Sequence, residues 1–199
     1  AKEGHSVKYL TIDDLRLWKK HSGIKKEPTV KQKSNIYIHN VTKNKASEVL
    51  KKTDRLIVVL GVHVPGKYLT AIPGTLKEVT SLLEDINKKI ILTGPAVFGT
   101  QLEGGKFAEK VKHDYEVKNY GASFEELEGF ADKGAEILQQ IPDKRIIEIE
   151  TSRGCRVGKC SFCTEPIKNK FVNRKMEDVV SEVVAYYKHG ARFFRIGKQ

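Results

Sequence analysis

The sequence has few sulfur-containing residues and no long apolar run. Its 199 residues include one methionine and three cysteines, and no cysteine precedes Cys155. An odd number of clustered cysteines does not suit a disulfide framework. No run approaches the roughly 18 apolar residues that a membrane-spanning helix needs, and the N-terminal AKEGHSVKYL is neither a signal nor a transit peptide. These absences disfavour secretion and membrane insertion, and we expect a cytoplasmic chain with no membrane partner.

The composition is otherwise that of a folded chain with a basic surplus at its two ends. It is 39% hydrophobic and 31% charged, with a formal net charge of +11, which argues against disorder. Residues 1–52 hold 13 basic and 5 acidic side chains, residues 53–143 hold 10 and 14, and residues 144–199 hold 13 and 6. The basic ends suit either a polyanion-binding surface or solvated loops, because charge alone indicates only non-specific attraction.

The apolar pattern alternates between strand and helix periods. The expected strands cover residues 7–12, 35–39, 55–60, 89–93, 145–150 and 192–196, and the expected helices cover 13–20, 46–52, 75–87, 123–140 and 176–187. The continuous apolar runs at 55–60 and 89–93 predict strands buried on both faces. Capping boxes at 75–78 and 123–126 predict two of the helix starts. The alternation predicts an α/β domain over residues 1–142, and then a βαβ unit over 143–199 with parallel strands.

The three cysteines form the strongest motif. Cys155-x4-Cys160-x2-Cys163 follows directly on the strand expected at 145–150. Three thiolates can hold one inorganic centre and leave one metal position open, as a catalytic centre requires. The carboxyl ends of parallel strands are also where α/β active sites are built. The structural alternative is a zinc site that takes a fourth ligand such as His189.

The stretch ETSRGC, which ends at Cys155, and the stretch CSFC, which ends at Cys163, resemble the cluster loop of radical S-adenosylmethionine (SAM) enzymes. The resemblance implies that the three cysteines bind a 4Fe-4S cluster and that SAM chelates its fourth iron. The reduced cluster would then cleave SAM to a 5′-deoxyadenosyl radical. Phe162 would flank the adenine, and Gly197 would lie under the methionine moiety. The usual spacing is C-x3-C-x2-C, so this chain has one extra residue in the first gap.

The wider sequence is similar to archaeal radical SAM proteins that carry a C-terminal helix-hairpin-helix. That similarity implies a Rossmann-like N-terminal domain over residues 1–142, lacking its first strand and helix, and the first βαβ of a partial (β/α) barrel over 143–199. We therefore expect an internal fragment that binds a cluster poorly and catalyses little alone, from an enzyme that needs an external electron donor. The basic ends, and the helix-hairpin-helix of similar proteins, suggest RNA or DNA as the otherwise unknown substrate.

Other cofactor motifs are incomplete. Gly61-x4-Gly66-Lys67 is close to a P-loop, but Tyr68 stands where Mg²⁺ binding needs Ser or Thr. Cobalamin is not supported, because no histidine lies in an Asp-x-His-x-x-Gly motif. The N-terminal region also lacks the cysteines of methylthiotransferases. Two other hypotheses stay open: a non-catalytic zinc or iron–sulfur module that binds nucleic acid, and a plain Rossmann-like ligand-binding domain.

Overall fold

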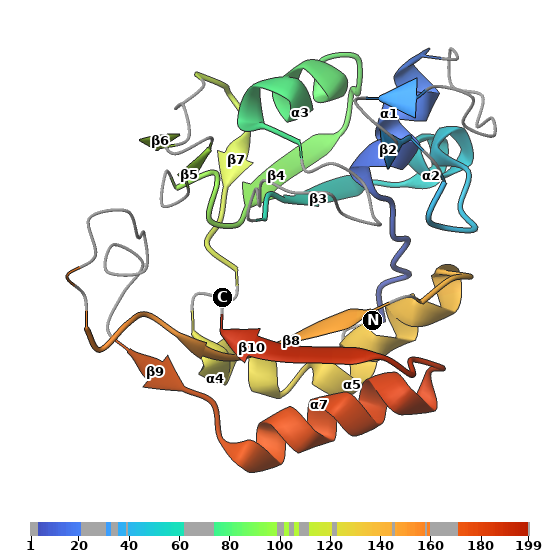
Figure 1. Ribbon diagram of the computed structural model, residues 1–199. Helices are drawn as coiled ribbons and strands as arrows, with labels where there is room; N and C mark the ends of the chain where they lie inside the picture. The colour runs from blue at the N-terminus through green and yellow to red at the C-terminus, as the bar shows by residue number, and fades with distance from the viewer. Residues whose placement is uncertain are drawn as a thin grey trace. The chain divides into compact units, whose positions relative to one another are not determined.

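The computed structural model describes most of the chain, and Figure 1 draws the described residues in colour. The described residues are 4–20, 31–32, 36–38, 40–61, 74–98, 102–103, 106–107, 112–120, 123–144, 146–157, 159 and 171–198. They form two compact units. We call Tyr9–Tyr120 the leader unit, and Ala1–Lys8 with Gly121–Gln199 the cysteine unit.

The leader unit contains a parallel sheet with strand order β3-β4-β7. Its elements are α1 (Ile12–Lys20), β1 (Lys31–Gln32), β2 (Ile36–Tyr37), α2 (Ala46–Lys52), β3 (Arg55–Val59), α3 (Leu76–Leu83), β4 (Lys89–Thr93), β5 (Leu102–Glu103), β6 (Lys106–Phe107) and β7 (Glu116–Val117). Strands β3 and β4 pair in parallel from Arg55↔Lys89 to Val59↔Thr93. β1 pairs with β2, and β5 with β6, in short antiparallel ladders.

One apolar core holds the helices of the leader unit on its sheet. Leu83 and Leu92 are at most 1% exposed, and the cluster around them joins α2 and α3 to one face of β3 and β4. Burial of this apolar surface is the main stabilising contribution to such a unit. The expectation that β4 is a buried strand is confirmed for its last four residues.

The expectation that β3 is buried on both faces is wrong. Its exposure alternates along the strand, and Ile57 and Val59 are 55% and 71% exposed. Leu56 and Val58 pack against the core cluster instead. β3 lies at the edge of its three-strand sheet, so only alternate side chains face the helices, and an apolar run alone does not reveal which face stays open.

The expected strand at 7–12 is also wrong, because α1 begins at Ile12 and no strand precedes it between residues 4 and 11. Thr11 starts the helix. Its backbone N–H donates to Asp14 Oδ2 over 2.9 Å, and the Asp14 N–H donates to Thr11 Oγ1 over 3.4 Å. This is the reciprocal pattern of a capping box, with Asp in place of Glu.

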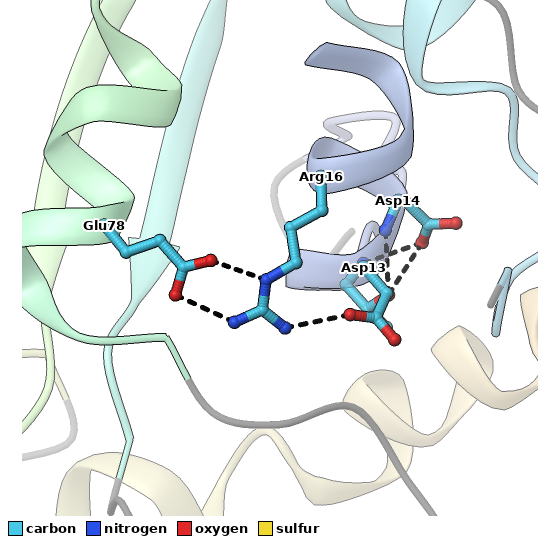
Figure 2. A network of polar contacts seen from close by, with 5 residues as sticks. Asp13, Asp14, Arg16 and Glu78 are labelled. Carbon is cyan, nitrogen blue, oxygen red and sulfur yellow. Dashed lines mark hydrogen bonds and ion pairs between the residues drawn. The ribbon is translucent and has the colours of Figure 1, made fainter. Parts of the chain in front are cut away.

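A buried ion triad joins α1 to α3. The Arg16 guanidinium donates to Asp13 Oδ1 over 2.9 Å and to the Glu78 carboxylate over 2.6 and 2.8 Å, as Figure 2 shows. Burial lowers the pKa of Arg16, but its hydrogen bonds to Glu78 and Asp13 more than offset this, and the net pKa is raised. Thr75 caps α3 as predicted, through a 3.1 Å bond from the Glu78 N–H, while the Glu78 carboxylate binds Arg16.

The cysteine unit contains a mixed sheet with strand order β10-β8-β9. Its elements are α4 (Phe124–Glu128), α5 (Ala131–Gly134), the 3-10 helix η1 (Ala135–Gln140), β8 (Ile147–Arg153), β9 (Val172–Asn173), α7 (Met176–Lys188) and β10 (Phe194–Lys198). β8 and β10 are parallel and are connected through α7, which lies along one face of the pair (Figure 1). β9 is antiparallel to β8. The α/β class and the βαβ unit are thus confirmed.

The helices before β8 differ from the single helix expected at 123–140. Ser123 caps α4 as predicted, through the Glu126 N–H at 3.3 Å. The helix ends at Gly129, and a short α-helix and a 3-10 helix follow. These helices belong to the cysteine unit, because α7 packs on α5 and η1 and the Gln140 amide donates to the Val7 carbonyl. The division after Tyr120 therefore lies earlier than the boundary predicted after residue 142.

Candidate functional site

The candidate site lies at the carboxyl end of β8. Cys155 is half-buried and comes two residues after Arg153, the last residue of that strand. Gly154 between them has a φ of 74°, a conformation that favours glycine and turns the chain out of the strand. The first predicted metal ligand therefore stands at the strand end where the sequence placed it.

Gly197 lies at the same end of the neighbouring parallel strand. It pairs with Glu150 in the β8–β10 register, and the register shifts between Gly197 and Lys198. Its carbonyl accepts a 3.0 Å hydrogen bond from Thr151 Oγ1. Among the described residues, a Cβ at Gly197 would meet no atom within 4 Å, so these residues leave space open beside the strand end. The structure thus brings Cys155 and Gly197 to one edge of the sheet.

The other predicted ligands and contacts are not placed. Cys160, Cys163 and Phe162 lie outside the described residues. Among the residues that are described, no group of three or more His, Cys, Asp or Glu side chains could hold a metal ion. Among the described residues, Cys155 is therefore the one predicted metal ligand whose position is known. Its thiol follows the end of β8, beside Gly197 of the parallel strand β10.

His189 does not belong to this site. It caps the C-terminal end of α7, and its Nδ1 lies 3.2 Å from Gln139 Nε2. The chain then reaches β10, whose Phe194 pairs with Ile147 at the start of β8. The two ends of β8, Ile147 and Arg153, are roughly 20 Å apart at about 3.3 Å per strand residue, and Cys155 lies beyond the Arg153 end. His189 is therefore excluded as a fourth ligand of a centre that includes Cys155.

An ionic cluster surrounds the strand end. The Arg153 guanidinium donates twice to the Glu150 carboxylate, over 2.8 Å in both bonds. Arg174 donates to the Glu150 carbonyl over 3.0 Å and pairs with the Glu182 carboxylate on α7. The Tyr186 hydroxyl donates to Glu182 Oε1 over 2.9 Å. The end of β8 is thereby connected to α7 through buried charges.

Two features of this cluster bear on its chemistry. Phe124 of α4 is 6% exposed, and the guanidinium carbons of Arg153 and Arg174 lie 4.6 and 5.6 Å from its ring centroid. Burial, and then the charge of Glu182, raise the pKa of Tyr186, so its phenol stays protonated at neutral pH. The cluster therefore combines two cations, two carboxylates and one neutral phenol beside the cysteine loop.

The residues of this cluster were not predicted from the sequence, although Glu182 carries one local signal. Glu182 falls within the apolar repeat of the helix expected at 176–187, between Val179 and Tyr186. A carboxylate on the buried stripe of a helix requires a partner. Nothing local in the sequence identifies that partner as Arg174.

No helix among the described residues is long and apolar enough to cross a membrane.

Comparisons with known proteins give relatives without an assigned activity. An uncharacterized protein of Methanocaldococcus jannaschii is 35% identical over 207 residues, which cover 84% of this chain and 38% of the relative. An uncharacterized protein of Archaeoglobus fulgidus is 38% identical over 166 residues, which cover 76% of this chain and 30% of the relative. No family model matches the chain, and no solved structure matches it. The chain thus spans less than two fifths of each of these archaeal relatives.

Proposed function

We propose that this chain carries the cysteine loop and the first βαβ of a radical SAM enzyme, preceded by a Rossmann-like domain. The observation that supports it most is the position of Cys155, two residues after a strand whose parallel neighbour carries Gly197 next to its last residue. Active sites of α/β proteins are built at such strand ends. The motif of Cys155, Cys160 and Cys163 supplies three thiolates for one centre.

Each described residue of the strand end has a definite task in this proposal. Cys155 provides a thiolate ligand, while Gly197 leaves room for SAM beside the strand. Thr151 donates a hydrogen bond to the Gly197 carbonyl, and the ion pair of Glu150 with Arg153 fixes the last residues of β8 before the loop. A bound 4Fe-4S cluster would supply the electron that breaks the sulfonium C5′–S bond of SAM, and an external reductant would reduce the cluster again. The protein itself contributes binding and orientation.

Anaerobic reconstitution of the natural protein that contains this chain, with iron and sulfide, tests the first step. We expect close to four irons and four sulfides per polypeptide, with the broad visible absorbance of a thiolate-bound cluster. SAM should change the electron paramagnetic resonance spectrum of the reduced cluster. C155A should lose the cluster, whereas S161A, inside the motif but without a thiol, should keep it.

The cleavage step is measured in the natural protein that contains this chain. With SAM and a reductant, it should form 5′-deoxyadenosine and methionine, and the product should disappear in C155A. Purification with one tightly bound zinc and no iron–sulfur uptake would instead support the non-catalytic metal module. A cluster that SAM leaves spectroscopically unchanged would contradict the radical SAM assignment.

A further inference from the structure

The cysteine loop leaves and rejoins the cysteine unit at a single place. It departs after Arg153 and returns at Val172, and these two residues pair in the antiparallel β8–β9 ladder. Two residues after Val172, the Arg174 N–H donates to the Thr151 carbonyl over 2.9 Å. The two ends of the loop are therefore held together by backbone hydrogen bonds, which supply part of the loop-closure entropy before a metal binds.

Arg174 adds side-chain contacts at this junction. Its side chain is 6% exposed, and its Nη1 reaches both the Glu150 carbonyl and the Glu182 carboxylate, whose side chain is 15% exposed. One guanidinium thus ties the return strand both to β8 and to α7. The Tyr186 hydroxyl bonds to the same carboxylate and fixes its orientation. A buried charge with a hydrogen-bonded partner of opposite sign holds its position firmly, since either partner alone would be costly to bury.

Phe124 completes the junction from α4. Its ring lies against the guanidinium groups of both Arg153 and Arg174. The two cations tolerate this proximity because each has its own carboxylate, Glu150 for Arg153 and Glu182 for Arg174. The residue before the loop and the residue that follows β9 are therefore held on one aromatic surface.

We propose that Arg174 is a positioning residue of the cysteine loop. It holds the return strand on the end of β8 before any metal binds, so that Cys155 leaves the sheet from a fixed point. The contacts that hold Arg174 at the junction reach Glu150, Thr151 and Glu182, so they form without a metal. The inference rests on the proposed function only for the identity of the centre that the loop holds.

The contact with Phe124 favours arginine over lysine at this position. One nitrogen, Nη1, donates to both the carbonyl and the carboxylate, while the planar guanidinium also lies against the Phe124 ring. Lysine would carry the charge as a single point and lose the planar contact with the ring. R174K should therefore restore only part of the effect, whereas a purely charge-based role would be restored fully.

The test compares R174Q, R174K and E182Q with R195Q. Arg195 of β10 and Glu148 of β8 also form an ion pair, of 2.8 Å, in the cysteine unit, but their side chains are 65% and 47% exposed. Hydrogen exchange of the metal-free chain reports on the amides of 172–174. We expect protection in the wild type and R195Q, and exchange close to that of an open loop in R174Q and E182Q. Protection of α7 verifies that each variant is folded.

The second measurement is retention of the reconstituted iron–sulfur cluster against a chelator. We expect R174Q and E182Q to hold it about 10- to 100-fold more weakly, the effect usual for residues that orient metal ligands, and R174K to fall between. Wild-type cluster retention and wild-type protection in both R174Q and E182Q would overturn the proposal. If the wild type takes up no cluster, the proposed function fails, and the exchange of amides 172–174 alone decides whether Arg174 holds the junction.

Discussion

The two units hold their sheets in different ways, although each contains a buried arginine. In the leader unit, Arg16 lies between Asp13 and Glu78 and joins α1 to α3, beside an apolar core that fixes both helices (Figure 2). In the cysteine unit, Arg174 joins Glu182 to the end of β8, where the cysteine loop begins. Both guanidinium groups are less than a tenth exposed.

The difference lies in what each arginine joins. Arg16 connects two regular helices whose packing already brings them together, so its ion pairs stabilise an interface. Arg174 connects the two ends of one loop. Among the described residues, the buried apolar cluster lies in the leader unit and does not include these loop ends. A buried ion pair is therefore weak evidence of a functional site by itself. Its position at the carboxyl end of a parallel strand gives it functional weight.

The largest effect is expected from R16M in the leader unit. Methionine keeps the length of the side chain but leaves the Asp13 carboxylate, 1% exposed, without its cation. Removing one partner of a buried pair lowers the free energy of unfolding by about 3–5 kcal/mol. Urea unfolding followed through Trp18, the single tryptophan, which packs against the leader core, measures the loss.

The control for this prediction is K45A. Lys45 and Glu48 form an ion pair with side chains 66% and 59% exposed, so its loss should leave the free energy of unfolding nearly unchanged. Amide exchange at 172–174 should be unchanged in R16M, because Arg16 acts within the leader unit. A loss in R16M no larger than in K45A would show that the triad contributes no more than a surface pair.

Two glycines with similar backbones give the next comparison. Gly94 after β4 and Gly190 after α7 have φ of 98° and 94°. A Cβ at Gly94 would lie 2.4 Å from the Leu60 carbonyl oxygen, whereas at Gly190 the nearest atom belongs to Lys144, at 3.6 Å. G190A should therefore cost only backbone strain, about 1–2 kcal/mol. G94A should cost at least about 1 kcal/mol more, because the two strand ends must separate.

Thermal unfolding of both variants, with amide exchange to assign the loss to a unit, measures this difference. G94A should weaken the hydrogen bond from the Leu60 N–H to the Thr93 carbonyl, 2.8 Å long in the structure, and G190A should affect the end of α7. Equal losses would mean that the close approach at Gly94 relaxes without cost.

The regular elements follow closely from local sequence signals. The helix predicted at 46–52 and the strand predicted at 89–93 have the bounds of α2 and β4, and α7 ends one residue after its predicted end. Each has a strong apolar period or a cap at its ends. The strand predicted at 7–12 is wrong because Thr11 and Asp14 form the capping pattern that starts α1 within that segment.

The site was only partly predictable. The cysteine motif and its position after β8 could be derived, because three clustered cysteines and a preceding apolar run are local signals. The Arg174 junction could not, because it depends on β9, a two-residue strand without a pattern of its own, and on pairing across the loop. The half of the capping box that Glu78 was expected to supply also failed, since Arg16, 62 residues away, binds its carboxylate.

The smallest effect is expected from Tyr186 of the cysteine unit, through the pH dependence of the free energy of unfolding. Burial first, and then the Glu182 charge, raise the pKa of this tyrosine. Above the ordinary tyrosine pKa of about 10, the unfolded chain loses this proton while the folded chain keeps it. The free energy of unfolding is therefore independent of this group at lower pH and falls as the pH rises past that value.

Y186F removes this contribution together with one hydrogen bond to Glu182, worth about 0.5–1.5 kcal/mol at neutral pH. Tyrosinate absorbance during an alkaline titration should lose one late-titrating group, and the alkaline fall in unfolding free energy should become shallower. Y187F is the matched control at the neighbouring tyrosine, whose side chain is 56% exposed. In the leader unit, Tyr9 has its pKa raised by burial and by Asp14, so part of the fall should survive in Y186F. An alkaline fall identical in Y186F and the wild type would mean that folding does not raise the pKa of Tyr186.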